Sequence, residues 1–322
     1  MPGIEPIRDL HLLPKTRDSW TFLYLEHVQV DQEAHAVAAH DARGTVLIPC
    51  ATLSVLMLGP GTSITHAAVR NLADSGCLVL WSGENGVRFY AQGMGETRSS
   101  RRLIRQAALV SNPATRLVVV RRMYEIRFPE PLKPDLTLQQ IRGMEGIRVR
   151  EAYAKASRET GVPWTGRSYQ RTGWAAADLP NRALSVANSA LYGIAHAAIV
   201  SAGYSPSLGF IHTGMMRSFV YDIADLYKVD ITIPVAFHAA AEGSADLERR
   251  VRTLCRDYFH ASRLLERIIP DIEHVLDVPI AVPEEAAEAA ADDDLPGGLW
   301  DPEAGIVGAG VNYGDHLVGE PR

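Results

Sequence analysis

One histidine and two acidic residues in the second half of the chain are candidate ligands of a divalent metal ion. His212 lies in the glycine-bounded segment GFIHTG at residues 209–214. Asp222, Asp225 and Lys228 follow at intervals of three, which places them along one flank of a helix. The two carboxylates would repel each other because they lie close together. A stripe of apolar residues runs beside them and would also reduce their hydration. A divalent cation would relieve that cost.

A further carboxylate, Glu145, lies between two glycines in a helical pattern. Gly143 and Gly146 flank it in the segment IRGMEGIRVR at residues 141–150. Each interior glycine costs a helix about 1 kcal/mol relative to alanine, so we expect something to approach the backbone closely there. One imidazole with two or three carboxylates suits Mg²⁺ or Mn²⁺ better than structural zinc, and it leaves ligand positions for water and phosphate oxygens.

Each of these residues also has an interpretation that needs no metal. Glu145 could be a surface residue paired with Arg142 or Arg148, and His212 could cap a helix or fill a gap. Lys228 could neutralise a phosphate oxygen or pair with a neighbouring carboxylate. The pattern favours phosphodiester chemistry. The alternatives are a non-catalytic nucleic-acid-binding scaffold and a phosphohydrolase of small nucleotides, which would need a closed pocket.

The elements that would position these residues fall into two regions. Short β-rich segments with one helix, at about 65–73, cover the first; the segments are 20–29, 46–49, 52–58 and 77–81. From residue 98 the apolar period changes from 2 to 3.6, and helices are expected at about 98–110, 115–127, 137–159, 181–202, 217–228 and 247–268. We therefore predict an α+β fold, with a small β-rich domain over residues 1–94, a larger all-α metal-binding domain over 95–282 and a tail over 283–322.

Charge is distributed unevenly along the chain. Residues 283–322 contain ten acidic residues and one arginine, whereas residues 1–282 carry a net charge of +3. Residues 98–127 hold eight arginines and one acid, which indicates an anionic partner unless these arginines lie on ordinary solvated helix faces. The acidic tail buries too little apolar surface to offset its ordering entropy, so we expect it to be mobile alone.

Composition excludes several classes of protein. No apolar run approaches the roughly 18 residues that span a bilayer, and the N-terminus lacks the basic and apolar regions of a secretory signal. Cys50, Cys77 and Cys255 lie far apart in apolar patterns, which indicates reduced core thiols in a cytoplasmic protein without membrane contact. The GPG turn at residues 59–61 lacks the third glycine of a dinucleotide fingerprint, so we do not expect a nucleotide there.

Three long motifs occur in a fixed order along the helical region. They are Gly-Met-Glu145-Gly-x-Arg148-x-Arg150, Gly203-Tyr204-x-Pro206-x-x-Gly209-Phe-Ile-His212-Thr-Gly214 and Phe219-Val-Tyr-Asp222-Ile-Ala-Asp225. Together they closely resemble the motifs of the CRISPR adaptation integrases, the larger of the two spacer-acquisition proteins, in their subtype I-E form. The resemblance covers about residues 19–278. It implies an N-terminal β-sandwich-like domain that carries dimer contacts and an α-helical domain that carries the metal.

The resemblance also implies an activity. Glu145, His212 and Asp225 would bind Mg²⁺ or Mn²⁺, and Asp222 would be a nearby essential acid. The reaction would be transesterification, in which the 3′-hydroxyl of a captured DNA fragment attacks a phosphodiester at the edge of a CRISPR repeat. Alone, the same site would act as a metal-dependent DNA endonuclease, with water replacing the hydroxyl. Lys228, one turn beyond the last ligand, would neutralise a phosphate oxygen.

Five further positions match DNA contacts of the family. Arg70 and Arg88 match basic positions used against the DNA backbone, unless they are ordinary surface arginines. Tyr169 and Tyr192 match aromatic positions near the 3′ strand, where stacking on a splayed base is worth roughly 1–3 kcal/mol, unless they belong to the core. His27 occupies the position where related proteins bracket the duplex end with a tyrosine. A second departure is a methionine at position 215, where some relatives have lysine.

The resemblance implies protein partners as well. The chain would form a homodimer, and two dimers would flank a small ferredoxin-like CRISPR adaptation partner protein. That complex would hold a short DNA duplex with single-stranded 3′ ends and join it to CRISPR repeat DNA. Part of residues 283–312 would become ordered on the partner protein, as an added strand anchored by Leu299-Trp300 and Ile306-Val307. The alternative is a tail that serves only solubility.

Overall fold

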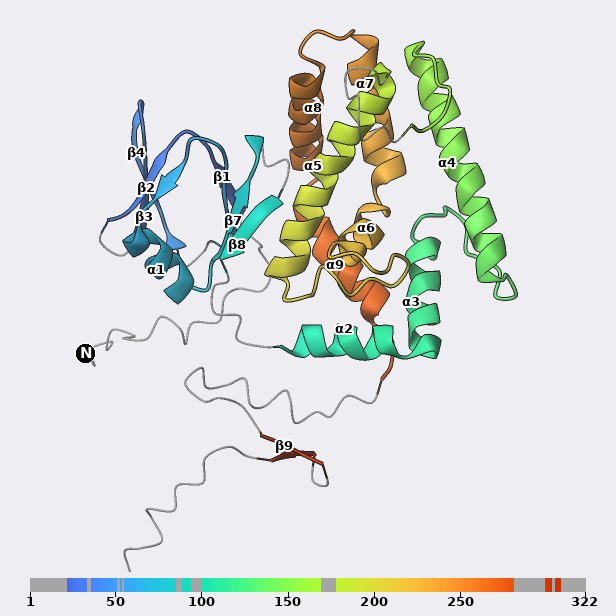
Figure 1. Ribbon diagram of the computed structural model, residues 1–322, viewed down its shortest axis with the longest axis horizontal. Coiled ribbons are helices and arrows are strands. Elements are labelled where there is room, and N and C mark those ends of the chain that lie inside the picture. Colours follow the sequence, from blue (N-terminus) through green and yellow to red (C-terminus); the bar gives the residue numbers. More distant parts are fainter. Residues whose placement is uncertain are drawn as a thin grey trace, which may run out of the picture.

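Most of the strands and most of the helices of the protein form two separate regions. The computed structural model describes residues 22–33, 36–50, 53, 55–84, 89–93, 100–168, 178–280, 299–302 and 305–307. Strands of residues 22–93 lie on one side of the molecule, and the helices that begin at residue 101 lie on the other (Figure 1). The predicted α+β class, with an N-terminal sheet region followed by a helical region, is confirmed.

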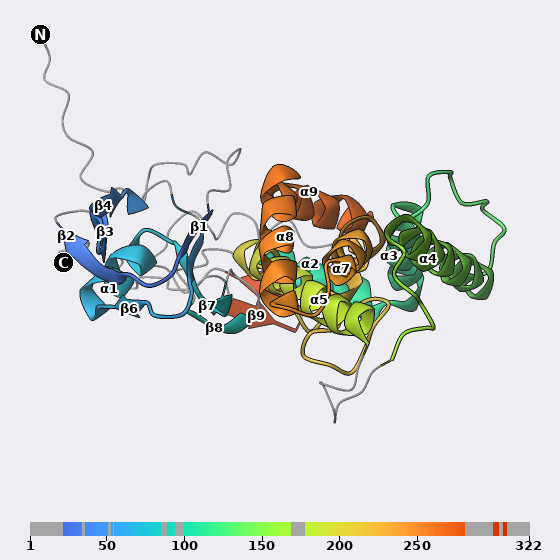
Figure 2. The same ribbon diagram turned by 90° about the horizontal axis from the view of Figure 1, so that it is seen from above.

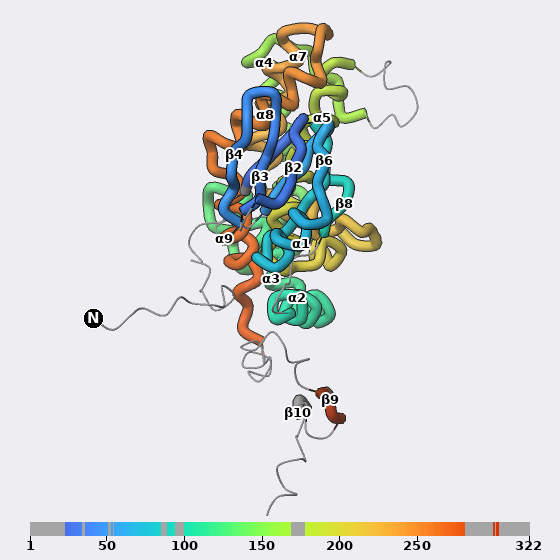
Figure 3. Tube along the Cα trace, turned by 90° about the vertical axis from the view of Figure 1, so that its left-hand side faces the viewer, coloured from blue at the N-terminus to red at the C-terminus, as the bar shows by residue number. Residues whose placement is uncertain are grey.

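Two four-stranded sheets share the core of the N-terminal region. The first has the order β1-β5-β7-β8 and contains β1 (Phe22–Leu25), β5 (Val55–Leu58), β7 (Leu78–Ser82) and β8 (Phe89–Gly93). The second has the order β4-β3-β2-β6 and contains β2 (Gln29–Glu33), β3 (Ala36–Asp41), β4 (Gly44–Ile48) and β6 (Ser63–Ile64). Both sheets and α1 (His66–Asp74) contribute buried apolar side chains to one cluster, and Figure 3 shows α1 beside the strands. The two sheets and α1 therefore share one apolar core.

The helical region surrounds one long central helix, α5 (Leu179–Ser201). Around it lie the other helices: α2 (Arg101–Ser111), α3 (Pro113–Glu125), α4 (Leu138–Thr160), α6 (Ser218–Ala224), the π-helical turn η5 (Lys228–Thr232), α7 (Ile233–Ala241), α8 (Leu247–Ala261) and α9 (Leu264–Leu276). Local sequence sets the ends of several of them. Thr137 and Gln140 form a capping box at the start of α4, and Gly161 ends that helix in the left-handed conformation. Asp178 caps α5 through its side chain.

Helix α5 also joins the two regions. Its residues Ala197 and Val200 pack with buried side chains of β5 and β7, so the first sheet lies against the C-terminal half of the helix (Figure 2). Among the described residues α5 has the length and apolar composition of a membrane span, which the expectation from the sequence missed. Of that apolar window, 67% is buried inside the protein, as is typical of a core helix.

Three expectations about individual elements were wrong, and one helix was not expected. A single strand over residues 20–29 is divided because His27 has a φ of 56°, so β1 and β2 belong to different sheets. A single helix over 247–268 is divided because Arg263 has a φ of 49°, which ends α8 and begins α9. The helix expected over 217–228 ends at Ala224, and the buried helix α7 was not expected. The three cysteines are buried and free, as expected.

The arginine-rich segment has a mainly structural role. Arg102, Arg105 and Arg122 donate hydrogen bonds to carbonyl oxygens at the ends of α5 and α9. Arg121 and Arg116 donate to carbonyl oxygens of the loops at Leu136 and Phe210. These guanidinium groups satisfy backbone acceptors that helix and loop ends leave unpaired. The arginine surplus of residues 98–127 is therefore weak evidence for an anionic partner.

A small hairpin is the described part of the acidic tail. Strands β9 (Leu299–Asp301) and β10 (Gly305–Val307) are antiparallel, with Leu299 opposite Val307 and Trp300 opposite Ile306. The two apolar pairs named from the sequence therefore pair with each other. Residues 281–298 and 308–322 lie outside the described residues. The mobility of the tail and its docking on a partner remain predictions.

Candidate metal centre

The centre is organised around the fully buried carboxylate of Asp222 on α6. Its oxygens accept hydrogen bonds from the backbone N–H groups of Phe210 (2.6 Å), Ile211 (3.1 Å) and His212 (2.9 Å). The imidazole Nδ1 of His212 lies 2.7 Å from Asp222 Oδ1. These contacts satisfy the carboxylate within the protein. Asp222 therefore positions the His212 loop, and its role as an essential acid beside the metal ligands remains a prediction.

The loop that carries His212 is held tightly from both sides. A Cβ atom at Gly209 would lie 2.4 Å from the carbonyl oxygen of His212 and 2.7 Å from Cβ of Ser218. The guanidinium group of Arg116, on α3, donates to the carbonyl oxygen of Phe210 at 2.8 and 3.0 Å. Only glycine fits at position 209, because any side chain there would force the loop away from α6.

His212 is half-buried, and its contacts leave Nε2 as the nitrogen for an outside ligand. The hydrogen bond with Asp222 is the main cause that raises the pKa of His212, and the charge of Asp225 raises it further. The ring lies edge-to-face with Tyr221 at a centroid distance of 5.8 Å. A carboxylate on one ring nitrogen that orients the other is the usual arrangement around metal-binding histidines. Metal binding would require the neutral form of the ring.

Glu145, on α4, has two arginine partners. Arg148 donates to it at 2.8 and 3.1 Å, so the surface pairing considered from the sequence is present. Arg127, whose side chain is 3% exposed, approaches Glu145 at 3.4 Å and the carbonyl oxygen of Asp222 at 3.5 Å. Nε of Arg127 has no hydrogen-bond partner among the described residues. One buried guanidinium thus links Glu145 to the helix of Asp222.

Asp225 and Lys228 contact each other directly. Oδ1 of Asp225 is buried, and the Lys228 ammonium is the group that contacts it. The Lys228 ammonium also lies 5.0 Å from the ring centre of Tyr192. Burial disfavours the charged form of Lys228, but Asp225 and Tyr192 outweigh this effect and raise its pKa. The pairing of Lys228 with Asp225, one of the two interpretations made from the sequence, is therefore observed.

The negative charges of the centre are balanced by positive side chains of the protein. Glu145 faces two arginines, Asp225 faces Lys228, and the remaining carboxylate is enclosed by N–H groups. Within the described ranges, no three acidic, histidine or cysteine side chains are placed to enclose an ion as they stand. The donor types still fit Mg²⁺ or Mn²⁺. Convergence of Glu145, His212 and Asp225 on one ion therefore remains a prediction.

The two glycines beside Glu145 lie on an open side of α4. A Cβ atom at Gly143 or Gly146 would meet nothing within 4 Å. The expected close approach to the backbone is therefore not made by any described residue. The helix instead leaves free space over these two glycines, on sides of α4 that Glu145 does not face.

The expected DNA contacts are spread over both regions. Tyr192 of α5 lies at the centre, edge-to-face with Tyr221 at 5.0 Å. Arg70, on α1, and His27, between β1 and β2, are exposed in the strand region, so they are not part of the centre. Arg88 and Tyr169 lie outside the described residues.

The sequence analysis missed two residues that hold the centre together, Arg116 and Arg127. Both belong to the arginine-rich segment, and no local pattern separates them from the other arginines there. Arg116 acts through Phe210, which is 94 residues away in the sequence. Arg127 acts through Glu145, which lies on the following helix, α4.

Comparison with known proteins assigns the chain to a family. Residues 127–252 match the family model of CRISPR associated protein Cas1. The chain is 54% identical over 320 residues to CRISPR-associated endonuclease Cas1 2 of Thermus thermophilus, which covers 99% of this chain and 98% of that protein. It is 43% identical over 279 residues to CRISPR-associated endonuclease Cas1 of Escherichia coli K12, covering 85% and 92%.

Solved structures give the same assignment. The chain resembles the crystal structure of a TtCas1-DNA complex with a TM-score of 0.76 and 56% sequence identity, covering 83% of this chain and 100% of that chain. The protein therefore belongs to the family of CRISPR associated protein Cas1. The family resemblance of the sequence motifs is confirmed, whereas the subtype I-E assignment remains a prediction.

Proposed function

We propose that this protein is a metal-dependent DNA integrase and endonuclease of CRISPR adaptation. It captures short DNA duplexes with single-stranded 3′ ends and joins their 3′-hydroxyl groups to the edge of a CRISPR repeat. The buried Asp222 carboxylate is the observation that carries the proposal, because it fixes His212 with Nε2 left for a ligand. The naming of the relatives as endonucleases and the TtCas1-DNA complex support it.

The bound cation would be Mg²⁺ or Mn²⁺, held by Glu145, His212 and Asp225, and it would polarise the phosphate and favour the ionised nucleophile. In transesterification the 3′-oxygen forms a new bond to phosphorus while the bond to the departing 3′-oxygen of the repeat strand breaks. The proton of the attacking hydroxyl passes to solvent, and the departing oxygen takes up a proton. Lys228 lies one turn from its neighbour Asp225, where its ammonium can neutralise a phosphate oxygen. The protein contributes mainly positioning.

The remaining DNA contacts and partners are part of the same proposal. Arg70 and Arg88 bind the DNA backbone, Tyr169 and Tyr192 stack near the 3′ strand, and His27 borders the duplex end. The protein acts in the cytoplasm as a homodimer, with two dimers around a small ferredoxin-like adaptation partner. Segments of the acidic tail dock on that partner.

A strand-transfer assay tests the proposal against the non-catalytic scaffold. The protein and its adaptation partner are mixed with a labelled duplex carrying 3′ overhangs, a plasmid with a CRISPR repeat, and Mg²⁺ or Mn²⁺. The native protein is expected to join the label to the repeat, and His212→Ala to lose this activity by at least about 100-fold. DNA affinity should change little, because phosphate contacts supply most of it.

A matched control keeps the assay specific. His238 is an exposed histidine on α7, and His238→Ala should retain full activity. The proposal fails if the native protein joins no DNA with any divalent cation. It also fails if His212→Ala loses DNA binding and joining to the same extent.

A further inference from the structure

The loop between α5 and α6 carries His212, and its two halves differ in burial. Tyr204 and Phe210, before the histidine, are buried, whereas residues 213–217, after it, are exposed. The backbone N–H and C=O groups of a buried loop cannot all reach water, so they need partners within the protein. These partners decide where the first half of the loop lies.

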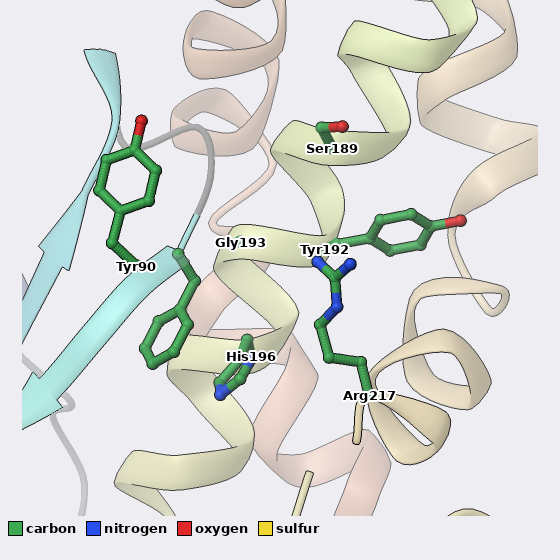
Figure 4. Close-up of a pocket in the computed structure, with 7 residues that line it drawn as sticks. Tyr90, Ser189, Tyr192, Gly193, His196 and Arg217 are labelled. Carbon is green, nitrogen blue, oxygen red and sulfur yellow. The ribbon is translucent and has the colours of Figure 1, made fainter. Parts of the chain in front are cut away.

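The exposed half of the loop is held by weaker contacts. Figure 4 shows Arg217, its last residue, beside α5 on the side of Tyr192. The Arg217 guanidinium group lies 5.7 Å from the ring centre of Tyr221, and cation–π contacts at exposed positions are weak. The Ser218 hydroxyl donates to the carbonyl oxygen of Met215 at 2.8 Å, which closes a local turn. The position of His212 therefore depends mainly on the buried half.

A fully buried glutamine, Gln106 of α2, binds the backbone of the buried half. Its Nε2 donates to the carbonyl oxygens of Ser205 and Leu208, both at 3.0 Å. Its Oε1 accepts a hydrogen bond from the N–H of Ser205 at 2.8 Å. A glutamine side chain has two N–H donors and one oxygen acceptor, so each of these groups is used on the loop.

Gln106 belongs to a row of side chains on α2 and α3 that bind successive groups of the loop. One turn earlier on α2, Arg102 donates to the carbonyl oxygen of Ala202 at 3.1 Å. Arg116 of α3 donates to the carbonyl oxygen of Phe210 at 2.8 Å. Gln106 holds the stretch between these two points. Because it is fully buried, water cannot replace its hydrogen bonds unless the core opens.

The stretch that Gln106 binds also contacts α6. The N–H of Phe219, in the first turn of α6, donates to the carbonyl oxygen of Pro206 at 2.9 Å. Asp222 lies one turn further along the same helix and binds His212. A shift of the loop at Pro206 would therefore act on both partners of the His212–Asp222 contact.

We propose that Gln106 is a positioning residue of the metal centre, which sets the place of His212 through the backbone of residues 205–208. The proposal rests on the proposed function, because the place of His212 matters only if His212 takes part in the reaction. It gives α2 a part in the centre, although no residue of α2 is a candidate ligand. A merely structural glutamine would stabilise the fold without an effect on His212.

Gln106→Met tests the proposal, because methionine fills a similar volume but forms none of the three hydrogen bonds. In NMR spectra of protein with ¹⁵N-labelled histidine, the Nδ1–H signal of His212 should shift or broaden as its 2.7 Å contact with Asp222 changes. His212→Ala identifies this signal. Strand transfer should fall about tenfold or more, and affinity for duplex DNA less than twofold.

Leu247→Ala is the control for lost stability. Leu247 is fully buried on α8 and belongs to a different apolar cluster from Tyr204 and Phe210 of the loop. The substitution should lower the melting temperature, but it should leave the His212 signal and the strand transfer of the folded protein unchanged. Equal changes in both variants would overturn the proposal, because lost stability alone would then explain them.

Amide hydrogen exchange of the native protein gives a test that needs no folded variant. The N–H of Ser205 is bonded to Gln106, and the N–H of His212 is bonded to Asp222. If the loop opens as one unit, the protection factors of these two N–H groups should agree within about tenfold. A larger difference would show that the contact with Gln106 opens separately, and it would overturn the proposal.

The outcomes distinguish the two proposals. If the native protein joins no DNA, the proposed function fails and the role of Gln106 in the reaction fails with it. If the native protein is active and Gln106→Met keeps the native His212 signal and native strand transfer, the role of Gln106 alone is wrong. Loss of DNA affinity as large as the loss of strand transfer would also overturn it, because the loop would then support binding rather than the place of His212.

Discussion

Two glycine-flanked segments carry candidate metal ligands, and their glycines serve opposite purposes. In the His212 segment, a Cβ atom at Gly209 would collide with the backbone at 2.4 Å. In the Glu145 segment, a Cβ atom at Gly143 or Gly146 would meet nothing within 4 Å. The first glycine lets the protein close on itself around Asp222. The other two leave α4 open on sides that the Glu145 side chain does not face.

This difference shows that glycine in a motif has no single meaning. The GPG turn at residues 59–61 belongs to the closed type, because a Cβ atom at Gly59 would lie 2.2 Å from the hydroxyl of Tyr24. Its glycines are explained by packing. The open glycines of α4 have no packing explanation and cost helix stability. A role in approach by an outside partner is therefore favoured for Gly143 and Gly146.

The largest effect is expected for Gly209→Ala. The added methyl group overlaps the His212 carbonyl and Ser218, so the loop must move away from Asp222 and expose its N–H donors. We expect a loss of about 3 kcal/mol in the free energy of unfolding, measured by urea denaturation. Gly214→Ala is the control. A φ of 81° strains any side chain there, but nothing lies within 4 Å, so this variant measures backbone strain without a collision. If Gly209→Ala costs less than Gly214→Ala, close packing is not the reason for the glycine.

Asp222→Asn should have the next largest effect. An amide nitrogen would replace one carboxylate oxygen and face backbone N–H donors, leaving them unsatisfied at a cost of about 1–3 kcal/mol. His212 would also lose the negative charge that orients it. Strand transfer should therefore fall more than DNA affinity, as measured in parallel. Asp230→Asn, at an exposed position, should leave both unchanged. Normal activity in Asp222→Asn would contradict the positioning role.

Arg127→Gln should destabilise the metal-free protein by about 2 kcal/mol. Breaking a buried ion pair usually costs 3–5 kcal/mol, but this pair is long and Glu145 keeps Arg148. Without the buried positive charge, Mg²⁺ should raise the melting temperature of the variant more than that of the native protein, as measured with EDTA as the reference. Arg148→Gln removes the more exposed partner and should cost less. A larger cost for Arg148→Gln would show that the buried arginine is not the main support of Glu145.

The smallest stability change is expected for Gly143→Ala and Gly146→Ala. Each should stabilise α4 by roughly 0.5–1 kcal/mol, because alanine favours a helix and meets no neighbour. Thermal unfolding measures this gain. Strand transfer should nevertheless decrease, since the methyl groups occupy the open surface of α4 that an outside partner would approach. If the variants are more stable and fully active, Gly143 and Gly146 are not needed for the approach of an outside partner.

The sequence predicted the fold well where periodicity and caps determine it, as in α4 and α5. It failed where one residue adopts a positive φ, because His27 and Arg263 carry no signal that distinguishes them from neighbours inside a regular element. The sequence also identified Asp222 and His212 by their motifs, and their contact is observed. It could not identify Arg127, because the need for a buried cation arises only when α4 and α6 pack together.

The convergence of Glu145, His212 and Asp225 on one divalent cation is the central claim, and anomalous X-ray diffraction from crystals grown with Mn²⁺ tests it most directly. The claim predicts one strong manganese peak about 2–2.6 Å from His212 Nε2 and from carboxylate oxygens of Glu145 and Asp225. Arg127 and Lys228 would then have moved away from those oxygens. A manganese site elsewhere, or one that lacks any of the three ligands, would contradict the claim.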